Sequence, residues 1–239
     1  MQIKANFHFH TKDDRSDKDH KIKGDINYDL FDGILAAKNC GIKALAVTCH
    51  NFVVTEKKYY EYAQKLGILL IPGIEKTIEK KHVVLLNVDK KAEEINTFKE
   101  LEEYKKLNPT ILVLAPHPFF HLGYSLGNKL LQNIKLFDAI EYSWFHLKKF
   151  NLNKKAEKIA KKYNLPIIAT SDTHNLNLLP KSYCILNIED LSWESVKKAI
   201  LNKNFENISP PQPFFSWDTW NWLPTIKKLQ KIFNKKGSK

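Results

Sequence analysis

The chain has 239 residues, a formal net charge of +12 at pH 7, 43% hydrophobic residues and 12% aromatic residues. This length is enough for one large α/β domain, and the apolar content excludes an intrinsically disordered chain. No apolar run approaches the roughly 18 residues that a bilayer span needs, and the polar first residues do not form a secretory signal.

The cysteines and the basic charge set expectations about compartment and partner. Cys40, Cys49 and Cys184 are odd in number and widely spaced, which predicts no disulfide framework and a reducing cytoplasm. The charge suits a polyanion, but it comes almost entirely from dispersed lysines. It therefore does not choose between a small phosphorylated substrate and a nucleic acid. The single arginine, Arg15, is a candidate phosphate ligand because its planar fork fits a phosphate group.

The first predicted element is a strand over residues 3–10, followed by a polar loop over 11–24. Side chains in a strand repeat every two residues, so His8 and His10 are expected on one face and Phe7 and Phe9 on the other. Two imidazoles at a strand end form half of a metal site. The alternative is a pair of histidines on the solvated face of an edge strand.

Short apolar runs then alternate with helical patterns. The predicted helices cover 28–40, 55–66, 91–107, 128–137, 153–163 and 193–202. The predicted strands cover 44–48, 68–71, 82–88, 110–115, 139–142, 166–170 and 182–188. Strand 68–71 is expected to break at Pro72-Gly73, and strand 82–88 to pair with the segment around Glu75. This alternation favours a parallel sheet covered by helices, either open or closed into a barrel.

The composition changes after about residue 205. A proline-rich segment, an aromatic cluster and a basic amphipathic end follow one another. We expect a domain over residues 1–205 and a tail over 206–239 that folds back on it. An interface helix and a membrane-surface element are the alternatives for this tail.

Metal-binding residue types follow five of the predicted strands near the point where each strand ends. They are His8 and His10, His50, Glu75, His117, and Asp172 with His174. The C-terminal strand ends of a parallel α/β fold meet at one mouth, where sites are assembled. The sequence therefore predicts one cluster of imidazoles and carboxylates.

These motifs resemble those of the polymerase-and-histidinol-phosphatase (PHP) domain superfamily over nearly all of residues 1–205. The matching segments are His8-Phe9-His10, Asp17, Thr48-Cys49-His50, Gly73-Ile74-Glu75, His82, His117-Pro118 and Ser171-Asp172-Thr173-His174. Within the superfamily the chain is most similar to stand-alone phosphoesterases of the bacterial TrpH type. The resemblance implies a distorted TIM-like (β/α)7 barrel of about seven strands.

The resemblance also implies up to three divalent ions, Zn, Mn or Fe, at the mouth of the barrel. One ion would be held by His8, His10, Glu75 and Asp172. Glu75 would bridge to a second ion, which His82 and His117 also hold. Asp17, His50 and His174 would hold the third.

Two positions depart from the family pattern. Cys49 stands where an aspartate is usual, and it either orients His50, ligates metal as a thiolate or fills space. The segment between His10 and Asp17 is about two residues longer than usual. Asp13, Asp14, Asp19 and His20 are therefore alternatives to Asp17.

The function implied is hydrolysis of a phosphomonoester, in a small metabolite or a nucleotide, by a metal-activated water. The first alternative is an exonuclease that acts on DNA or RNA ends with the same metals. The second is a non-catalytic nucleic-acid-binding barrel, which the nearly complete ligand set disfavours. The sequence assigns no side chain to protonate the leaving oxygen and does not set the oligomeric state.

Overall fold

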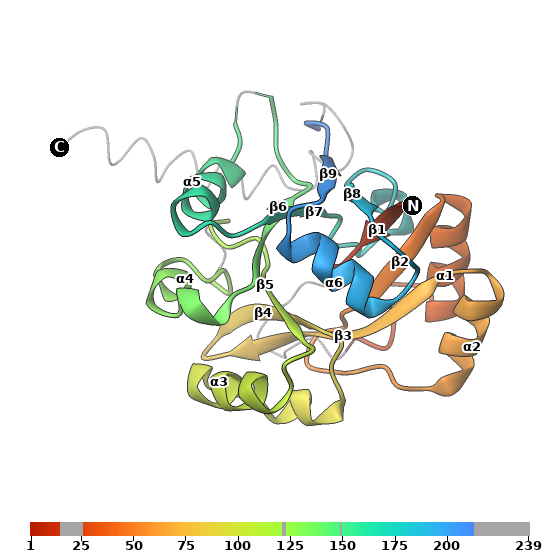
Figure 1. Ribbon diagram of the computed structural model, residues 1–239, viewed down its shortest axis with the longest axis horizontal. Coiled ribbons are helices and arrows are strands. Elements are labelled where there is room, and N and C mark those ends of the chain that lie inside the picture. Colours follow the sequence, from red (N-terminus) through yellow and green to blue (C-terminus); the bar gives the residue numbers. More distant parts are fainter. Residues whose placement is uncertain (15–25, 121–122, 149, 213–239) are drawn as a thin grey trace.

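The computed structural model describes residues 1–14, 26–120, 123–148 and 150–212 (Figure 1). Arg15, Asp17 and most of the expected tail, residues 213–239, lie outside the described residues. None of the helices in the described ranges has both the length and the apolar character needed to cross a bilayer.

The described strands form one sheet in the order β7-β6-β5-β4-β3-β2-β1-β8-β9. They are β1 (Gln2–Asn6), β2 (Ile42–Val47), β3 (Leu69–Ile78), β4 (Lys81–Leu86), β5 (Leu112–Ala115), β6 (Ala139–Ser143), β7 (Ile167–Thr170), β8 (Tyr183–Asn187) and β9 (Phe205–Ile208). Strands β1, β2, β3, β5, β6 and β7 run in the same direction, whereas β4 and β8 are antiparallel to their neighbours. The sheet is therefore mixed, although a parallel sheet was expected.

The sheet curves into a nearly closed barrel, because β7 at one edge approaches β8 and β9 at the other. The side chain of Asn207 on β9 joins these edges: it accepts a hydrogen bond from the backbone of Ala169 at 2.7 Å and donates one to Ile167 at 2.8 Å. Beyond the strand ends, Phe9 forms a parallel bridge with Thr173. The C-terminal ends of β1 and β7 are thus held together at the mouth.

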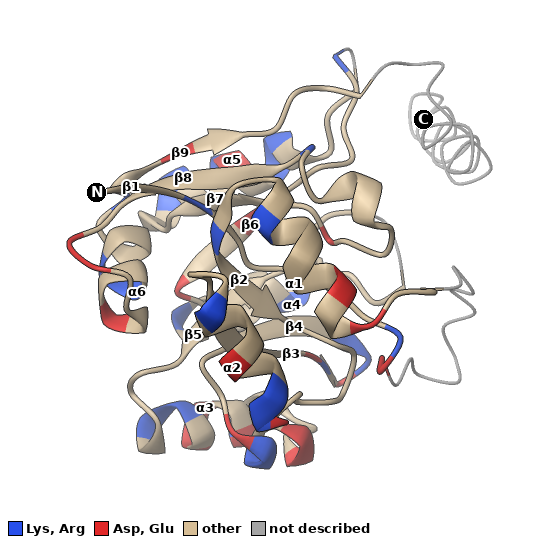
Figure 2. Cartoon of the chain, turned by 90° about the vertical axis from the view of Figure 1, so that its right-hand side faces the viewer, with Lys and Arg blue, Asp and Glu red and all other residues tan. Residues whose placement is uncertain are grey.

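Six α-helices and three short 3₁₀ helices lie in the described part of the chain. They are α1 (Leu30–Asn39), α2 (Lys57–Lys65), η1 (Lys90–Glu94), α3 (Phe98–Leu107), α4 (Asn128–Gln132), η2 (Ile134–Leu136), α5 (Asn153–Tyr163), η3 (Leu176–Leu178) and α6 (Trp193–Leu201). Apolar residues of α1 and α2 pack with β2 and β3, and those of α3, α4 and α5 pack with β3 to β6. Figure 2 shows acidic and basic residues side by side on the outer faces of α2 and α3.

Helix α6 closes the barrel at the end opposite the mouth. Trp193 and Ile200 of α6 belong to the same buried cluster as small and aliphatic side chains from β1, β2, β5 and β8. The Trp193 indole donates to the carbonyl of Thr110, just before β5 begins, at 2.8 Å. Within the described residues, α6 therefore covers the end of the barrel opposite the C-terminal strand ends.

Two predicted elements differ from those observed because of local capping and pairing. The predicted helix 91–107 is divided, because Thr97 and Glu100 form a capping box that starts α3 afresh. Strand β3 does not break at Pro72-Gly73 but changes partner there, from β2 to β4. A side chain at position 73 would lie 2.9 Å from the Thr48 methyl, so glycine permits this crossover.

Further differences concern one helix, the last strand and the end of β1. The predicted helix 128–137 is split into α4 and η2, and the sequence did not predict β9. Strand β9 spans the expected domain boundary at residue 205 and pairs with β8. Phe7 and Phe9 were expected on one face, but they pack in different clusters because regular strand pairing of β1 ends at Asn6. The pairing of residues 82–88 with the Glu75 segment is confirmed, with Glu75 opposite Val84.

Candidate metal centre

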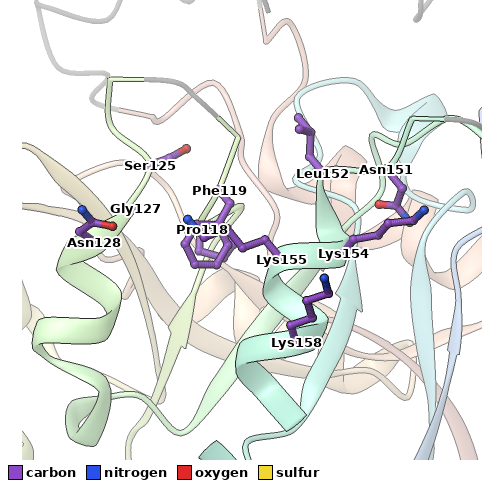
Figure 3. Close-up of a pocket in the computed structure, with 10 residues that line it drawn as sticks. All are labelled: Pro118, Phe119, Ser125, Gly127, Asn128, Asn151, Leu152, Lys154, Lys155 and Lys158. Carbon is purple, nitrogen blue, oxygen red and sulfur yellow. The ribbon is translucent and has the colours of Figure 1, made fainter. Parts of the chain in front are cut away.

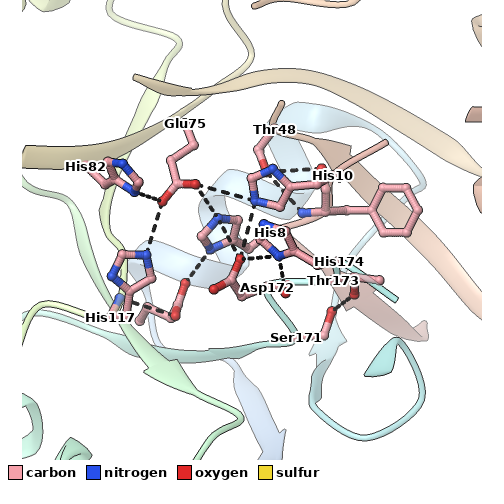
Figure 4. A network of polar contacts seen from close by, with 12 residues as sticks. His8, His10, Thr48, Glu75, His82, His117, Ser171, Asp172, Thr173 and His174 are labelled. Carbon is pink, nitrogen blue, oxygen red and sulfur yellow. Dashed lines mark hydrogen bonds and ion pairs between the residues drawn. The ribbon is translucent and has the colours of Figure 1, made fainter. Parts of the chain in front are cut away.

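One buried carboxylate, that of Glu75 on β3, lies at the centre of the site (Figure 4). Its oxygen Oε1 faces two histidines from neighbouring parts of the barrel. Nδ1 of His82, on β4, lies 2.9 Å away, and Nε2 of His117, just after β5, lies 3.1 Å away. Both imidazoles are buried.

The other oxygen, Oε2, faces the histidines at the ends of β1 and β2. Nε2 of His50 lies 2.8 Å away, and Nε2 of His8 and His10 lie 3.3 and 3.4 Å away. Oδ1 of Asp172 lies 3.4 and 3.3 Å from the His8 and His10 nitrogens. Glu75 thus separates two sets of nitrogen donors, which is the position of a carboxylate that bridges two metal ions.

Two further carboxylates orient His8 and His10. Nδ1 of His8 lies 2.7 Å from Oε2 of Glu141, a fully buried residue on β6. Nδ1 of His10 lies 2.6 Å from Oδ2 of Asp14. A ring that donates from Nδ1 to a carboxylate presents a lone pair at Nε2. Both rings therefore turn their ligating nitrogen toward Glu75 and Asp172.

Asp14 also holds His50, and so connects the ends of β1 and β2. Nδ1 of His50 lies 2.8 Å from its Oδ2, and the backbone N–H of His50 donates to its Oδ1 at 3.0 Å. The ring centre of His10 lies 4.5 Å from that of His50 and 4.2 Å from that of His174. Asp14, one of the alternatives to Asp17 as a ligand, therefore lies in the site. Asp17 itself lies outside the described residues.

Two candidate ligands have strained backbones. His117 has φ +27° and Asp172 has φ +44°, in the left-handed region that residues with a Cβ avoid. Such a conformation costs about 1–3 kcal/mol and persists only where surrounding contacts over-determine it. The backbone N–H of His117 donates to Glu141 at 3.2 Å, which is one of those contacts.

The carboxylates dominate the electrostatics of the cluster. Burial opposes the charged form of His50, but Glu75 and Asp14 raise its pKa to about 10. Burial also disfavours a charged His8, yet Asp172, Glu75 and Glu141 raise its pKa. In contrast, burial and neighbouring His10 lower the pKa of His174 to about 4. A field that holds protons on His8 and His50 also attracts a divalent cation, which displaces these protons on binding.

Several donor atoms in this site fit a metal and form no hydrogen bond. Among the described residues, Nε2 of His8 and His10, Nδ1 of His117 and Oδ1 of Asp172 are buried without a hydrogen-bond partner. An unsatisfied buried polar atom costs about 1–3 kcal/mol. Coordination of a cation would remove this cost, and a mixed set of imidazole and carboxylate donors suits Zn, Mn or Fe. The residues present therefore fit the metals that the resemblance implies.

Three groups of described side chains bring ligand atoms within 4.8 Å of one another. They are His8, His10, Glu75 and Asp172; His50, Glu75 and His82; and His10, His50 and His174. The first group has the four residues expected to hold one ion. The second group contains His50 where His117 was expected, although His117 also contacts Glu75. The third group contains His50 and His174, as expected, together with His10. The assignment of ligands to individual ions remains a prediction.

The sequence interpretation missed Glu141 and left Asp14 among several alternatives. A glutamate within the apolar run 139–142 was the available signal, because a buried carboxylate needs partners. Nothing in the spacing indicated that its partner is His8, 133 positions away in the chain. The choice of Asp14 depends on the path of the loop after His10.

Cys49 fills space beside the cluster. Its thiol is fully buried and lies 3.4 Å from the hydroxyl of Thr11. Burial raises the pKa of this thiol to about 12, which opposes a thiolate. Asp14, and not Cys49, accepts the hydrogen bond from Nδ1 of His50.

One of the described histidines lies outside the cluster. His146 follows β6, and its Nε2 lies 3.0 Å from the carbonyl of Ser209. It belongs to none of the three ligand groups. His121 and the candidate phosphate ligand Arg15 lie outside the described residues.

Two family models match the sequence of this chain. The family model of the PHP domain matches residues 24–134, and that of the PHP-associated region matches residues 151–204. No curated protein matches the chain.

Solved structures share the fold at low sequence identity. A two-domain protein from Bacteroides vulgatus, described as containing a predicted PHP-like metal-dependent phosphoesterase, is 19% identical with a TM-score of 0.62, and the match covers 87% of this chain and 64% of that one. PsfC from Pseudomonas syringae is 13% identical with a TM-score of 0.61, and the match covers 97% of this chain and 99% of that one. A lesion-specific endonuclease from Pyrococcus furiosus is 15% identical with a TM-score of 0.59, over 87% of this chain and 58% of that one. The chain thus spans less than two thirds of the first and third of these proteins.

Proposed function

Because this chain belongs to the PHP domain superfamily, a family of metal-dependent phosphoesterases, we propose that it hydrolyses a phosphomonoester in a small phosphorylated molecule. The observation that carries this proposal is Glu75, whose two oxygens lie between the imidazoles that follow β1 and β2 and those on β4 and just after β5. Bound divalent ions at such a site activate water and polarise a phosphoryl oxygen.

Carboxylates of the chain would orient the histidines that hold the metal ions. Glu141 and Asp14 fix the tautomers of His8, His10 and His50, so that the Nε2 atoms face the centre. Because α6 packs across the opposite end of the described barrel, substrate and water would reach the site from the mouth. A reducing cytoplasm is part of this proposal, and the three cysteines are free thiols.

Metal analysis and two variants test the proposal. Protein purified without chelator should contain more than one divalent ion per chain. His8→Ala and Asp172→Ala should each abolish hydrolysis of p-nitrophenyl phosphate while the circular dichroism spectrum is preserved. Full turnover in either variant would show that this cluster is not the active site. His146→Ala is the matched control, because His146 lies outside the ligand groups.

An exonuclease activity is the second candidate, favoured by the net charge of +12. The two activities separate in one assay on mononucleotides and on labelled single strands, each at two salt concentrations. Degradation restricted to strands and weakened steeply by salt would favour the exonuclease. Hydrolysis of mononucleotides with weak salt dependence would favour the phosphatase.

A further inference from the structure

Asn6, the last residue of β1, is a fully buried polar residue that lies outside the three ligand groups. It stands two residues before His8 in the chain. Its side-chain amide uses both donor and both acceptor positions, in hydrogen bonds to His8, Ser171 and Ser182. These partners lie just after β1, just after β7 and just before β8, so the amide connects three segments at the mouth of the barrel.

The oxygen of this amide joins two backbone segments that carry candidate ligands. Oδ1 of Asn6 accepts from the backbone N–H of His8 at 3.3 Å and from that of Ser171 at 3.4 Å. His8 is itself a candidate ligand, and Ser171 directly precedes the candidate ligand Asp172. One oxygen atom thus sets the spacing between the backbones that carry these two side chains.

The nitrogen of the amide holds Asn6 against the strands on the other side. Nδ2 donates to the hydroxyl of Ser171 at 2.7 Å and to the carbonyl of Ser182 at 2.9 Å. A carbonyl only accepts and a backbone N–H only donates, so these partners determine which way round the amide lies. A hydroxyl or an ionised carboxylate at this position would lose at least one of the contacts.

The backbone that Asn6 holds is next to the strained one at Asp172. Asp172 has φ +44°, a conformation that persists only where surrounding contacts over-determine it. On its C-terminal side, the N–H of Thr173 donates to the carbonyl of His8 at 3.2 Å. On its N-terminal side, Asn6 contacts both the N–H and the hydroxyl of Ser171. The strained residue is therefore fixed from both directions, and Asn6 supplies the restraint on one of them.

This restraint acts on the first ligand group. Oδ1 of Asp172 lies 3.4 Å from Nε2 of His8 and 3.3 Å from Nε2 of His10, so the carboxylate lies equally far from both imidazoles. A ligand has to stay within about 0.5 Å of its productive position for a metal site to work. Rotation of the backbone at Asp172 would move the carboxylate away from both nitrogens.

We propose that Asn6 is a positioning residue of the metal centre, which fixes the backbone of Asp172 relative to His8 so that both side chains serve the same ion. Asn6 is not a ligand and acts through the backbones of His8 and Ser171. This inference rests on the metal centre of the proposed function and is independent of the substrate.

The substitution Asn6→Ala tests the proposal, with Asn153→Ala as the matched control. Asn153 is also a buried asparagine, 1% exposed, and its side chain forms hydrogen bonds of 3.0 and 2.9 Å with the backbone of Ser143. It begins α5 beside a pocket of about 670 Å³, which Leu152 and Lys154 help to line (Figure 3). Both variants lose buried hydrogen bonds to backbone, but Asn6→Ala also releases a segment that carries candidate ligands.

Binding of Co²⁺ to the full-length protein is the measurement. Chelator competition gives the affinity, and the visible absorption spectrum of the bound Co²⁺ reports the arrangement of its ligands. In Asn6→Ala we expect at least one ion to bind about tenfold or more weakly, and the spectrum to change, because the carboxylate of Asp172 is no longer held in place. Asn153→Ala should keep the affinity and the spectrum of the wild type, and urea unfolding compares the stability of the two variants. Equal losses of affinity in both variants, or no loss in either, would overturn the proposal.

A milder pair of substitutions keeps the test decisive if Asn6→Ala does not fold. Ser171→Ala removes the hydroxyl that accepts from Asn6. Ser182→Ala removes another buried hydroxyl, which donates to Ser209 at 3.0 Å, and leaves the Ser182 carbonyl in place for Asn6. Co²⁺ should bind more weakly to Ser171→Ala and unchanged to Ser182→Ala. Wild-type affinity in Ser171→Ala would then overturn the proposal.

The same titrations separate this inference from the proposed function. If the variants differ as expected while the wild type hydrolyses no phosphoester, Asn6 keeps its positioning role and the phosphoesterase proposal fails. If the wild type hydrolyses p-nitrophenyl phosphate and all variants bind Co²⁺ alike, the phosphoesterase proposal stands and the role of Asn6 fails. A wild-type protein that binds no Co²⁺ would overturn both.

Discussion

Oε2 of Glu141 lies 2.7 Å from Nδ1 of His8, and both side chains are completely buried. The other oxygen of Glu141 accepts a hydrogen bond from the backbone N–H of His117 at 3.2 Å. One carboxylate thus orients one candidate ligand and supports the strained backbone of another. Glu141 acts through these two candidate ligands, so its role is to position them.

Glu141→Ala should weaken metal binding by about 10- to 100-fold, the usual cost of losing a partner behind a ligating histidine. Glu141→Gln keeps an acceptor for His8 and should show a smaller loss. Competition with a fluorescent chelator measures both affinities. The exposed Glu206→Gln is the control. Affinity in Glu141→Ala equal to that of the wild type would contradict the positioning role.

Asp14→Asn should lower metal affinity because Asp14 holds the Nδ1 atoms of both His10 and His50. Removal of its charge weakens these hydrogen bonds and favours the wrong tautomer. We expect a loss of about tenfold or more in the same chelator competition. Asp13→Asn, one residue earlier, should have little effect. A larger loss in Asp17→Asn than in Asp14→Asn would return the role to Asp17.

Removal of divalent ions should lower the unfolding temperature. The cluster holds several buried atoms without hydrogen-bond partners, and a ligand that binds only the folded state stabilises it by mass action. An excess of ion at about 100 times Kd adds about 2.7 kcal/mol. Calorimetric scans with and without EDTA measure the shift. The shift should shrink in His8→Ala, and an EDTA effect of full size in that variant would argue against binding at His8.

Asn207→Ala should destabilise the barrel without changing the chemistry of the metal centre. Its side chain makes two hydrogen bonds from β9 to β7, each worth about 0.5–1.5 kcal/mol. We expect a loss of about 1–3 kcal/mol in the free energy of unfolding, measured with urea. Asn187→Ala removes an exposed asparagine hydrogen bond and is the control. Equal stability of the two variants would mean that Asn207 does not hold the barrel edges together.

The order of strands and helices was largely readable from local pattern. Alternating apolar runs and helical spacing predicted α1, α2, α5 and α6 to within a few residues. The wrong predictions lie where a capping signal was overlooked or where a segment is a strand only because it pairs with another strand. Thr97 divides a continuous helical pattern by capping, and β9 is short and only partly buried, so its strand character comes from pairing with β8.

The types of the candidate ligands were determined by the sequence alone, because imidazoles and carboxylates at successive strand ends can be recognised without coordinates. The tertiary structure decided which of these side chains lie in contact with one another. It brought Glu141 behind His8 and placed Asp14 between His10 and His50. The physical reason is that strand periodicity is a local property of the backbone. Contacts between strands far apart in the sequence depend on how the sheet curves and closes, which no short segment encodes.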